Sequence, residues 1–332
     1  MKKPMSHKTE KFLLLWLPCL IVLLAGAVLV PQILHIVSPA QEYLPVENIE
    51  ELVPVVADIE IADEIKTPQL IAPIEIIPVE TESYPPASPY GWQEKEDGTR
   101  CYVLDDGSLA HGLRYIDDQL EFFDQNGRSA KSIGIDVSFY NGTVNWDAVK
   151  KAGIDFAVIR VGGRGWGSGG TLYKDSLYFN YLNGAKAAGL DVGVYFYSAA
   201  ANEAEAIQEA SLAISLLKKF DLDLPVFYDT ELSGNYPKGR ADLIPMANRV
   251  EITNAFCRVI ENAGYEAGIY ASESFLTDEL NYPAINDRCI WMASYTENNA
   301  LPFKVTEFDI WQLTDRGRIT GVSGYCDINV MF

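Results

Sequence analysis

Short runs of apolar residues alternate with amphipathic stretches through the last two hundred residues of the chain. The apolar runs are four to eight residues long and rich in Val, Ile, Phe and Tyr, which is typical of strands buried on both faces. Between them, apolar positions recur at helical spacing in 204–219, where Asn202 is a candidate N-cap, and in 246–260. We predict strands at 134–137, 156–161, 192–197, 225–229, 267–270, 289–292 and 308–311, and a last short strand near residue 327.

One strand–helix unit recurs along this region. The segments 152–158, 188–194 and 263–269 each begin with Ala-Gly, where a helix would end in a left-handed cap, and continue through an acidic turn residue into a strand. Strands alternating with helices form a parallel sheet covered by helices, so the fold class is α/β. About eight strands in two hundred residues favour an irregular (β/α) TIM-like barrel over an open sheet. The last three strands lie too close together for full helices between them, so we expect irregularity in the second half.

The N-terminus carries a different pattern. Residues 1–11 hold four lysines and one glutamate, and 12–37 form an almost uninterrupted apolar run that is long enough to span a bilayer as a helix. The basic flank should stay in the cytoplasm, which places the C-terminal domain outside the cell membrane. We therefore expect a single-pass signal anchor. Small residues up to Ala27 leave open a cleaved signal peptide and a secreted product, but the apolar run continues past them.

Two segments separate this run from the C-terminal domain. Residues 38–90 combine frequent prolines with eleven acidic residues and a single base, Lys66, which favours an extended linker. Residues 91–130 contain two copies of a motif of about 21 residues, in which aromatic pairs and Asp/Asn-Gly turns indicate short β-hairpins. The copies resemble the cell-wall-binding repeats of choline-binding proteins. Leu113 replaces the expected tryptophan, so a structural stalk remains the alternative.

Charge and histidine content exclude several functions. The formal net charge of −20 argues against nucleic acid as a partner. All three histidines precede residue 132, so the domain at 132–332 cannot contain a Ser-His-Asp or Cys-His site, and we expect neither a metal nor a cofactor. The five cysteines show no dense framework. A Cys289–Cys326 disulfide remains open in an exported protein, but we favour isolated buried thiols.

Carboxylates and aromatic residues gather at the carboxyl ends of the predicted strands, which is where barrel enzymes place their working residues. Asp229 and Glu231 stand two residues apart on an extended segment, so both point to one face. Close like charges raise the proton affinity of one member of such a pair. Paired acids with aromatic rings are typical of sugar-cleaving clefts. The candidates are Asp136, Tyr195, Tyr197, Asp229, Glu231, Trp291, Tyr295, Trp311 and Asp327.

Five motifs extend this picture across residues 133–332, and together they resemble the family 25 glycoside hydrolases, the Chalaropsis-type lysozymes or muramidases. The resemblance implies an irregular barrel and hydrolysis of the β-1,4 bond between N-acetylmuramic acid and N-acetylglucosamine in peptidoglycan. The motifs are Gly134-Ile135-Asp136-Val137-Ser138, Val144-Asn145-Trp146, Tyr228-Asp229-Thr230-Glu231, Trp311-Gln312 and Asp327-Ile328-Asn329.

The same resemblance implies roles for individual residues. Glu231 would be the general acid/base and Asp229 its partner, stabilising an oxocarbenium ion or an oxazolinium intermediate. Asp136 and Asp327 would line the cleft and tune Glu231. The aromatic candidates named above would contact sugar. Phe139-Tyr140 departs from the histidine and aromatic found in many members.

The glycine-rich segment 162–170 also departs from the family pattern. We interpret it as a mobile cleft lid from which Trp166 or Arg164 reaches the substrate.

Two other functions stay open. A catalytically silent protein could keep the barrel as a reader or scaffold for wall glycan. A chitinase-like glycosidase would carry further aspartates before the Asp-x-Glu pair, where this chain has Val226, Phe227 and Tyr228. We expect a monomer that acts on peptidoglycan strands and is held to the lipid bilayer by its N-terminal helix.

Overall fold

The computed structural model describes residues 44–45, 90–218, 220–234, 238–296, 301–302 and 304–332. The predicted anchor at 12–37 and nearly all of the linker at 38–90 lie outside these residues. Among the helices described, none combines the length and the apolar character that a bilayer crossing requires.

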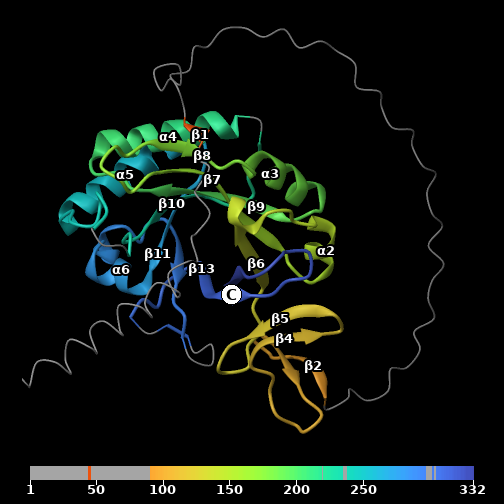
Figure 1. Ribbon diagram of the computed structural model, residues 1–332. Coiled ribbons are helices and arrows are strands. Elements are labelled where there is room, and N and C mark those ends of the chain that lie inside the picture. The colour runs from red at the N-terminus through yellow and green to blue at the C-terminus, as the bar shows by residue number, and fades with distance from the viewer. Residues whose placement is uncertain (1–43, 46–89, 219, 235–237, 297–300, 303) are drawn as a thin grey trace, which may run out of the picture. The chain divides into compact units, whose positions relative to one another are not determined.

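Within the described residues, eight strands close a barrel (Figure 1). Pairing runs in the order β6, β7, β9, β10, β11, β12, β13, β14 and back to β6, with β7 paired directly to β9. All pairs from β6 to β13 are parallel, and every predicted strand overlaps an observed one. The strands are β6 (Ser132–Val137), β7 (Phe156–Arg164), β9 (Asp191–Ser198), β10 (Val226–Thr230), β11 (Ala267–Ser272), β12 (Cys289–Ala293), β13 (Ile310–Gly317) and β14 (Cys326–Met331).

The last strand departs from the predicted parallel sheet, because β14 runs antiparallel to both β13 and β6. Only the short segment 318–325 joins β13 to β14, whereas a parallel crossover needs a dozen or more residues. The expected irregularity in the second half is therefore confirmed. The antiparallel register also sets Asp327 directly opposite Asp136.

Helices cover the first half of the barrel. α3 (Tyr178–Ala187), α4 (Glu203–Leu217) and α5 (Met246–Asn262) lie outside β7 to β11 (Figure 1). The Asn202 side chain caps α4 by accepting a hydrogen bond from the Glu205 amide, as predicted. Gly153, Gly189 and Gly264 have φ values of +92°, +76° and +87°, which confirms the left-handed caps.

Shorter elements complete the barrel region. They are α2 (Trp146–Lys151), α6 (Glu273–Asp278), the 3₁₀ turns η3 (Phe139–Asn141) and η4 (Tyr282–Ala284), β8 (Leu172–Lys174), which pairs with β7, and β1 (Leu44–Pro45), which pairs with β8.

Two β-hairpins precede the barrel, as the repeats predicted: β2 (Gly91–Glu94) with β3 (Arg100–Val103), and β4 (Gly112–Ile116) with β5 (Gln119–Phe123). Among the described residues, no helix follows β12. The second hairpin, β4–β5, packs on the outside of the barrel in this region. The fully buried Phe122 ring lies 5.6 Å from Trp311 and 6.0 Å from Phe332, centroid to centroid. The Leu120 amide donates to the Ala152 carbonyl. This hairpin therefore closes the core from outside.

The barrel interior is apolar toward the amino ends of the strands and polar at their carboxyl ends. Phe156, Val158, Phe227, Trp291 and Ile310 fill the apolar part. The next inward-facing positions toward the carboxyl ends of the strands are polar, so the site rests on a packed floor. The four described cysteines are free thiols, and a Cys289–Cys326 bridge is not formed.

Candidate active site

A cavity of about 210 Å³ lies at the carboxyl ends of the strands, and all four predicted acids line it. A larger hollow of about 590 Å³ adjoins it toward α6 and shares Glu231, Tyr270 and Tyr295 with it. The cavity therefore forms part of a longer cleft. Its lining is Asp136, Arg160, Tyr195, Tyr197, Asp229, Glu231, Tyr270, Trp291, Tyr295, Gln312 and Asp327.

Asp136 on β6 and Asp327 on β14 lie opposite each other, and each affects the pKa of the other. The Oδ2 atom of Asp136 accepts hydrogen bonds from the Gln312 Nε2 atom at 2.8 Å and the Asn329 Nδ2 atom at 2.9 Å. Burial, together with the negative charge of Asp136, raises the pKa of Asp327 to about 9. Asp327 is thus protonated near neutral pH and donates to Asp136. Burial raises the pKa of Asp136 as well, but the hydrogen bonds from Asn329, Gln312 and Asp327 oppose that rise, so Asp136 is the member of the pair that can hold the charge.

Asp229 and Glu231 approach the cavity from β10 and the residues just after it. Asp229 is 3% exposed, and its Oδ1 atom has no hydrogen-bond partner in the described part of the chain. Burial, and then the charges of Glu231 and Asp136, raise the pKa of Asp229 well above its usual range. Burial also raises the pKa of Glu231 to about 7, whereas the hydrogen bonds of Glu231 with Tyr270 and Tyr197 lower it. A carboxyl group with this pKa can both donate and accept a proton near neutral pH.

Gln312 and Tyr270 were not predicted as site residues. The Oε1 atom of Gln312 accepts hydrogen bonds from the hydroxyls of Tyr270 and Tyr295, both at 2.8 Å, while its amide nitrogen donates to Asp136. Gln312 therefore ties the Asp136 carboxylate to the aromatic wall. Its place in the Trp311-Gln312 motif, at the carboxyl end of a predicted strand, was the available signal.

Four of the predicted sugar contacts line the cavity. Tyr195, Tyr197 and Trp291 lie deep in it, and Tyr295 lies at the rim with 55% of its surface exposed. The Trp291 indole nitrogen donates to the Asn329 Oδ1 atom at 2.7 Å, and its ring packs against Tyr195 and Tyr270. Trp291 thus forms the floor of the site, whereas Tyr295 is open to ligand.

The prediction for Trp311 is wrong. Its side chain is fully buried against Phe122 on the outer face of the barrel, and its indole nitrogen donates to the Ser294 carbonyl at 2.8 Å. Successive side chains of a strand point to opposite faces, so Gln312 faces the cavity and Trp311 cannot.

The glycine-rich segment also differs from its prediction. Residues 162–164 are strand residues paired with β8, so this part is not a lid, and the buried Arg164 points away from the cavity to Glu209. Trp166 does not line the cavity either. Its ring packs edge-on against Tyr197 at 5.9 Å and lines a neighbouring hollow of about 510 Å³ with Ser233 and Arg240.

No metal-binding cluster of His, Cys, Asp or Glu occurs in the described ranges. The chemistry that these side chains offer is proton transfer by coupled carboxyl groups between aromatic walls. A closed barrel with such a cavity at the carboxyl ends of its strands is the architecture of a barrel-type glycoside hydrolase. Residues 135–322 match the family described as glycosyl hydrolases family 25, and the chain belongs to this family.

Two lysozymes are similar in sequence to this chain and agree with this assignment. The chain is 28% identical over 202 residues to the autolytic lysozyme of Clostridium acetobutylicum, covering 59% of this chain and 54% of the relative. It is 30% identical over 206 residues to lysozyme M1 of Streptomyces globisporus, covering 59% and 66%. The chain thus spans between half and two thirds of the length of these relatives.

A solved structure of the modular autolysin LytC from Streptococcus pneumoniae, in complex with a synthetic peptidoglycan ligand, has a similar fold. It superposes with a TM-score of 0.58 at 25% identity, covering 73% of this chain and 58% of that one.

Proposed function

We propose that this protein is a lysozyme-type muramidase, which hydrolyses the β-1,4 bond between N-acetylmuramic acid and N-acetylglucosamine in peptidoglycan. The observation that carries the proposal is Glu231, whose pKa is raised to about 7 in a cavity that it shares with Asp229, Asp136 and Asp327. The names of the relatives and the ligand of the autolysin structure support peptidoglycan as the substrate.

Glu231 is the general acid/base of the proposed reaction. The protonated carboxyl donates its proton to the glycosidic oxygen as the bond to the anomeric carbon breaks. The 2-acetamido carbonyl oxygen of the substrate attacks that carbon and forms an oxazolinium ion, which Asp229 stabilises. Glu231, now ionised, takes a proton from water as the water oxygen opens this ring. The anomeric configuration is therefore retained, and NMR showing the inverted anomer as first product would contradict this route.

Asp136 and Asp327 act on Glu231 through charge. The negative charge of Asp136 helps to raise the pKa of Glu231, and the protonated Asp327 keeps that charge in place. The two residues therefore tune the acid and orient the sugar rather than exchange protons with the substrate.

Zymography on peptidoglycan tests the proposal. Wild-type protein should clear the gel and the Glu231→Gln variant should not, while Glu251→Gln, an exposed acid on α5, should clear like the wild type. Mass spectrometry of the released muropeptides should show N-acetylmuramic acid at the new reducing end. N-acetylglucosamine at that end, or equal clearing by Glu231→Gln, would overturn the assignment.

We propose a structural role for the two hairpins. The Arg100 guanidinium lies 4.0 Å from the centroid of the Trp92 ring, and Tyr102 and Phe123 pack around that ring. A cation of the chain itself thus occupies the face that a choline group would need. The protein should pass through choline-agarose without retention, and elution only with free choline would contradict this role.

For localisation we propose a retained membrane anchor at residues 12–37, on the strength of the apolar run and its basic flank. Membrane fractions should hold the protein after an alkaline wash. A soluble product that begins after Ala27 would show that the segment is a cleaved signal peptide instead.

A further inference from the structure

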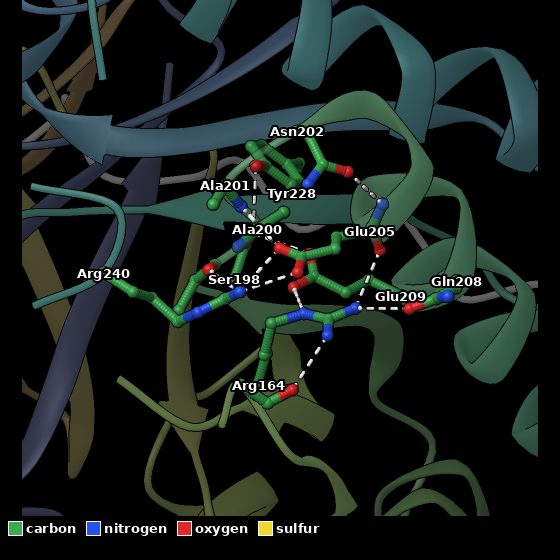
Figure 2. A network of polar contacts seen from close by, with 12 residues as sticks. Arg164, Ser198, Ala200, Ala201, Asn202, Glu205, Gln208, Glu209, Tyr228 and Arg240 are labelled. Carbon is green, nitrogen blue, oxygen red and sulfur yellow. Dashed lines mark hydrogen bonds and ion pairs between the residues drawn. The ribbon is translucent and has the colours of Figure 1, made fainter. Parts of the chain in front are cut away.

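Strand β7 carries two buried arginines whose surroundings differ. Arg164 faces away from the cavity, and each of its nitrogens has a partner (Figure 2). Its Nε atom donates to the Glu209 carboxylate at 2.7 Å, and its two Nη atoms donate to the carbonyls of Gly170 and Glu205 at 2.8 and 2.9 Å. The hydroxyl of Ser198 links Glu209 onward to Tyr228. This network is complete, so Arg164 joins β7 to α4 as a structural residue.

Arg160 faces the cavity and is incompletely paired. Its Nε atom donates to the buried Asp175 carboxylate at 2.9 Å, but its Nη2 atom has no partner among the described residues. The side chain is 6% exposed and lines the cavity with the catalytic candidates. An unpaired donor on a buried charged group is unfavourable, and native proteins keep few of them. The guanidinium thus has spare donor capacity at the site.

Two aromatic rings hold Arg160 in place. The guanidinium carbon lies 5.0 Å from the Phe139 ring centroid and 5.3 Å from that of Tyr140, within the range of cation–π attraction. The Asp175 carboxylate also accepts a hydrogen bond from the Phe139 amide, so one acid fixes both the cation and the turn that covers it. Phe139 and Tyr140 thus support Arg160 from the turn after β6.

The best partner for this group is a carbonyl or carboxylate oxygen. Guanidinium keeps its charge at any accessible pH and presents its donors in a fixed plane, which suits planar acceptors such as amide and carboxyl groups. N-acetylmuramic acid carries two such groups, the N-acetyl group and the lactyl group, whereas the sugar hydroxyls are weaker acceptors.

We propose that Arg160 is a substrate-binding residue whose guanidinium donates hydrogen bonds to a carbonyl or carboxylate oxygen on the N-acetyl or lactyl substituent of the bound sugar. The inference rests on the proposed muramidase function and adds a group that recognises the substituents of the sugar rather than the bond that is cut.

Calorimetric titration of the full chain, purified in mild detergent and carrying Glu231→Gln, tests the proposal. The ligands are the disaccharide N-acetylglucosaminyl-N-acetylmuramic acid and chitotriose, which lacks the lactyl group. Arg160→Lys should raise the Kd for the disaccharide about tenfold, because lysine keeps the charge toward Asp175 but loses the planar donors. Arg164→Lys is the matched control, and its Kd should stay within twofold of the parent even if its melting temperature falls.

Chitotriose identifies the acceptor. A similar rise in its Kd with Arg160→Lys assigns the contact to the N-acetyl group, and an unchanged Kd assigns it to the lactyl group. An unchanged Kd for both ligands in a folded Arg160→Lys protein would overturn the proposal. If that variant does not fold, the double variant Arg160→Met/Asp175→Asn, which removes the ion pair as a whole, takes its place and is read in the same way.

The proposed function is checked separately by gel clearing with the unmodified chain. Clearing by the wild type together with an unchanged Kd for Arg160→Lys would contradict only the proposed role of Arg160. A raised Kd for Arg160→Lys without clearing by the wild type would contradict the muramidase function and support a role of Arg160 in sugar binding.

Discussion

Four acids with nearly the same chemistry receive different protonation states from their surroundings. Burial raises the pKa of Asp136, but two amides and Asp327 donate to it and favour its charged form, whereas burial and the charge of Asp136 keep a proton on Asp327. Burial raises the pKa of Glu231 to about 7 and leaves Asp229 without a hydrogen-bond partner for one oxygen among the described residues. Burial and neighbouring hydrogen-bond donors thus determine which of the four carboxyl groups carries a proton.

The raised pKa of Glu231 predicts the pH dependence of the reaction. The acid must carry a proton in the free enzyme, so kcat/KM should be lost as the pH rises through about 7, with a tenfold fall per unit above it. Initial rates on a soluble glycan fragment between pH 4 and 9 measure this limb. An alkaline limb centred near pH 4.5, the usual value for a glutamate, would show that the site does not perturb Glu231.

The Asp136–Asp327 pair should respond unequally to amide substitution. Asp327→Asn keeps a donor toward Asp136, so kcat/KM should fall by less than about tenfold. Asp136→Asn removes the charge that three donors surround, and we expect a loss of at least about a hundredfold, roughly 3 kcal/mol in the transition state. Steady-state kinetics of both variants, with circular dichroism to confirm folding, make the comparison. Equal losses in the two variants would contradict the assignment of the proton to Asp327 and of the charge to Asp136.

At the scale of elements, short connections shape the second half of the barrel in two ways. The segment between β13 and β14 is too short for a crossover helix, so β14 runs antiparallel to its neighbours, and this direction places Asp327 opposite Asp136. No described helix follows β12, and the hairpin β4–β5 covers this side of the barrel, where Phe122 packs against Trp311 in β13 and Phe332 after β14. A built-in Cβ at Gly153 would come within 2.6 Å of the Leu120 amide nitrogen, so the hairpin sits directly on this turn.

The hairpin should therefore contribute to barrel stability. Phe122→Ala removes a fully buried ring, and we expect the free energy of unfolding to fall by about 3–5 kcal/mol. Tyr115→Ala on β4 of the same hairpin removes a ring that is 54% exposed and should change it by less than about 0.5 kcal/mol. Urea denaturation followed by tryptophan fluorescence measures both. A small effect of Phe122→Ala would mean that the hairpin is a separate module.

In the whole molecule, an apolar N-terminal run comes first along the sequence, an acidic, proline-rich linker follows it, and the catalytic region comes last. If the linker spans the distance from membrane to wall, its length governs which glycan strands the site can reach and leaves the chemistry unchanged.

Deleting residues 50–79 tests the spacer. This variant should release fewer muropeptides from walls when expressed in cells, while its kcat/KM on a soluble glycan fragment stays within twofold of the wild type. A matching loss on the soluble fragment would show that these residues contribute to the catalytic region itself.

The sequence alone determined the strand–helix succession, the glycine caps, the cap at Asn202 and the gathering of acids at one end of the barrel, because periodicity and turn chemistry are local properties. It could not determine the direction of β14, since that depends on which edges must close a barrel. Nor could it separate Trp311 from Trp291, because the face that a strand residue presents follows from sheet register. Tertiary structure also decided which donors surround each carboxylate, as residues 136, 312 and 329 meet only in the closed barrel.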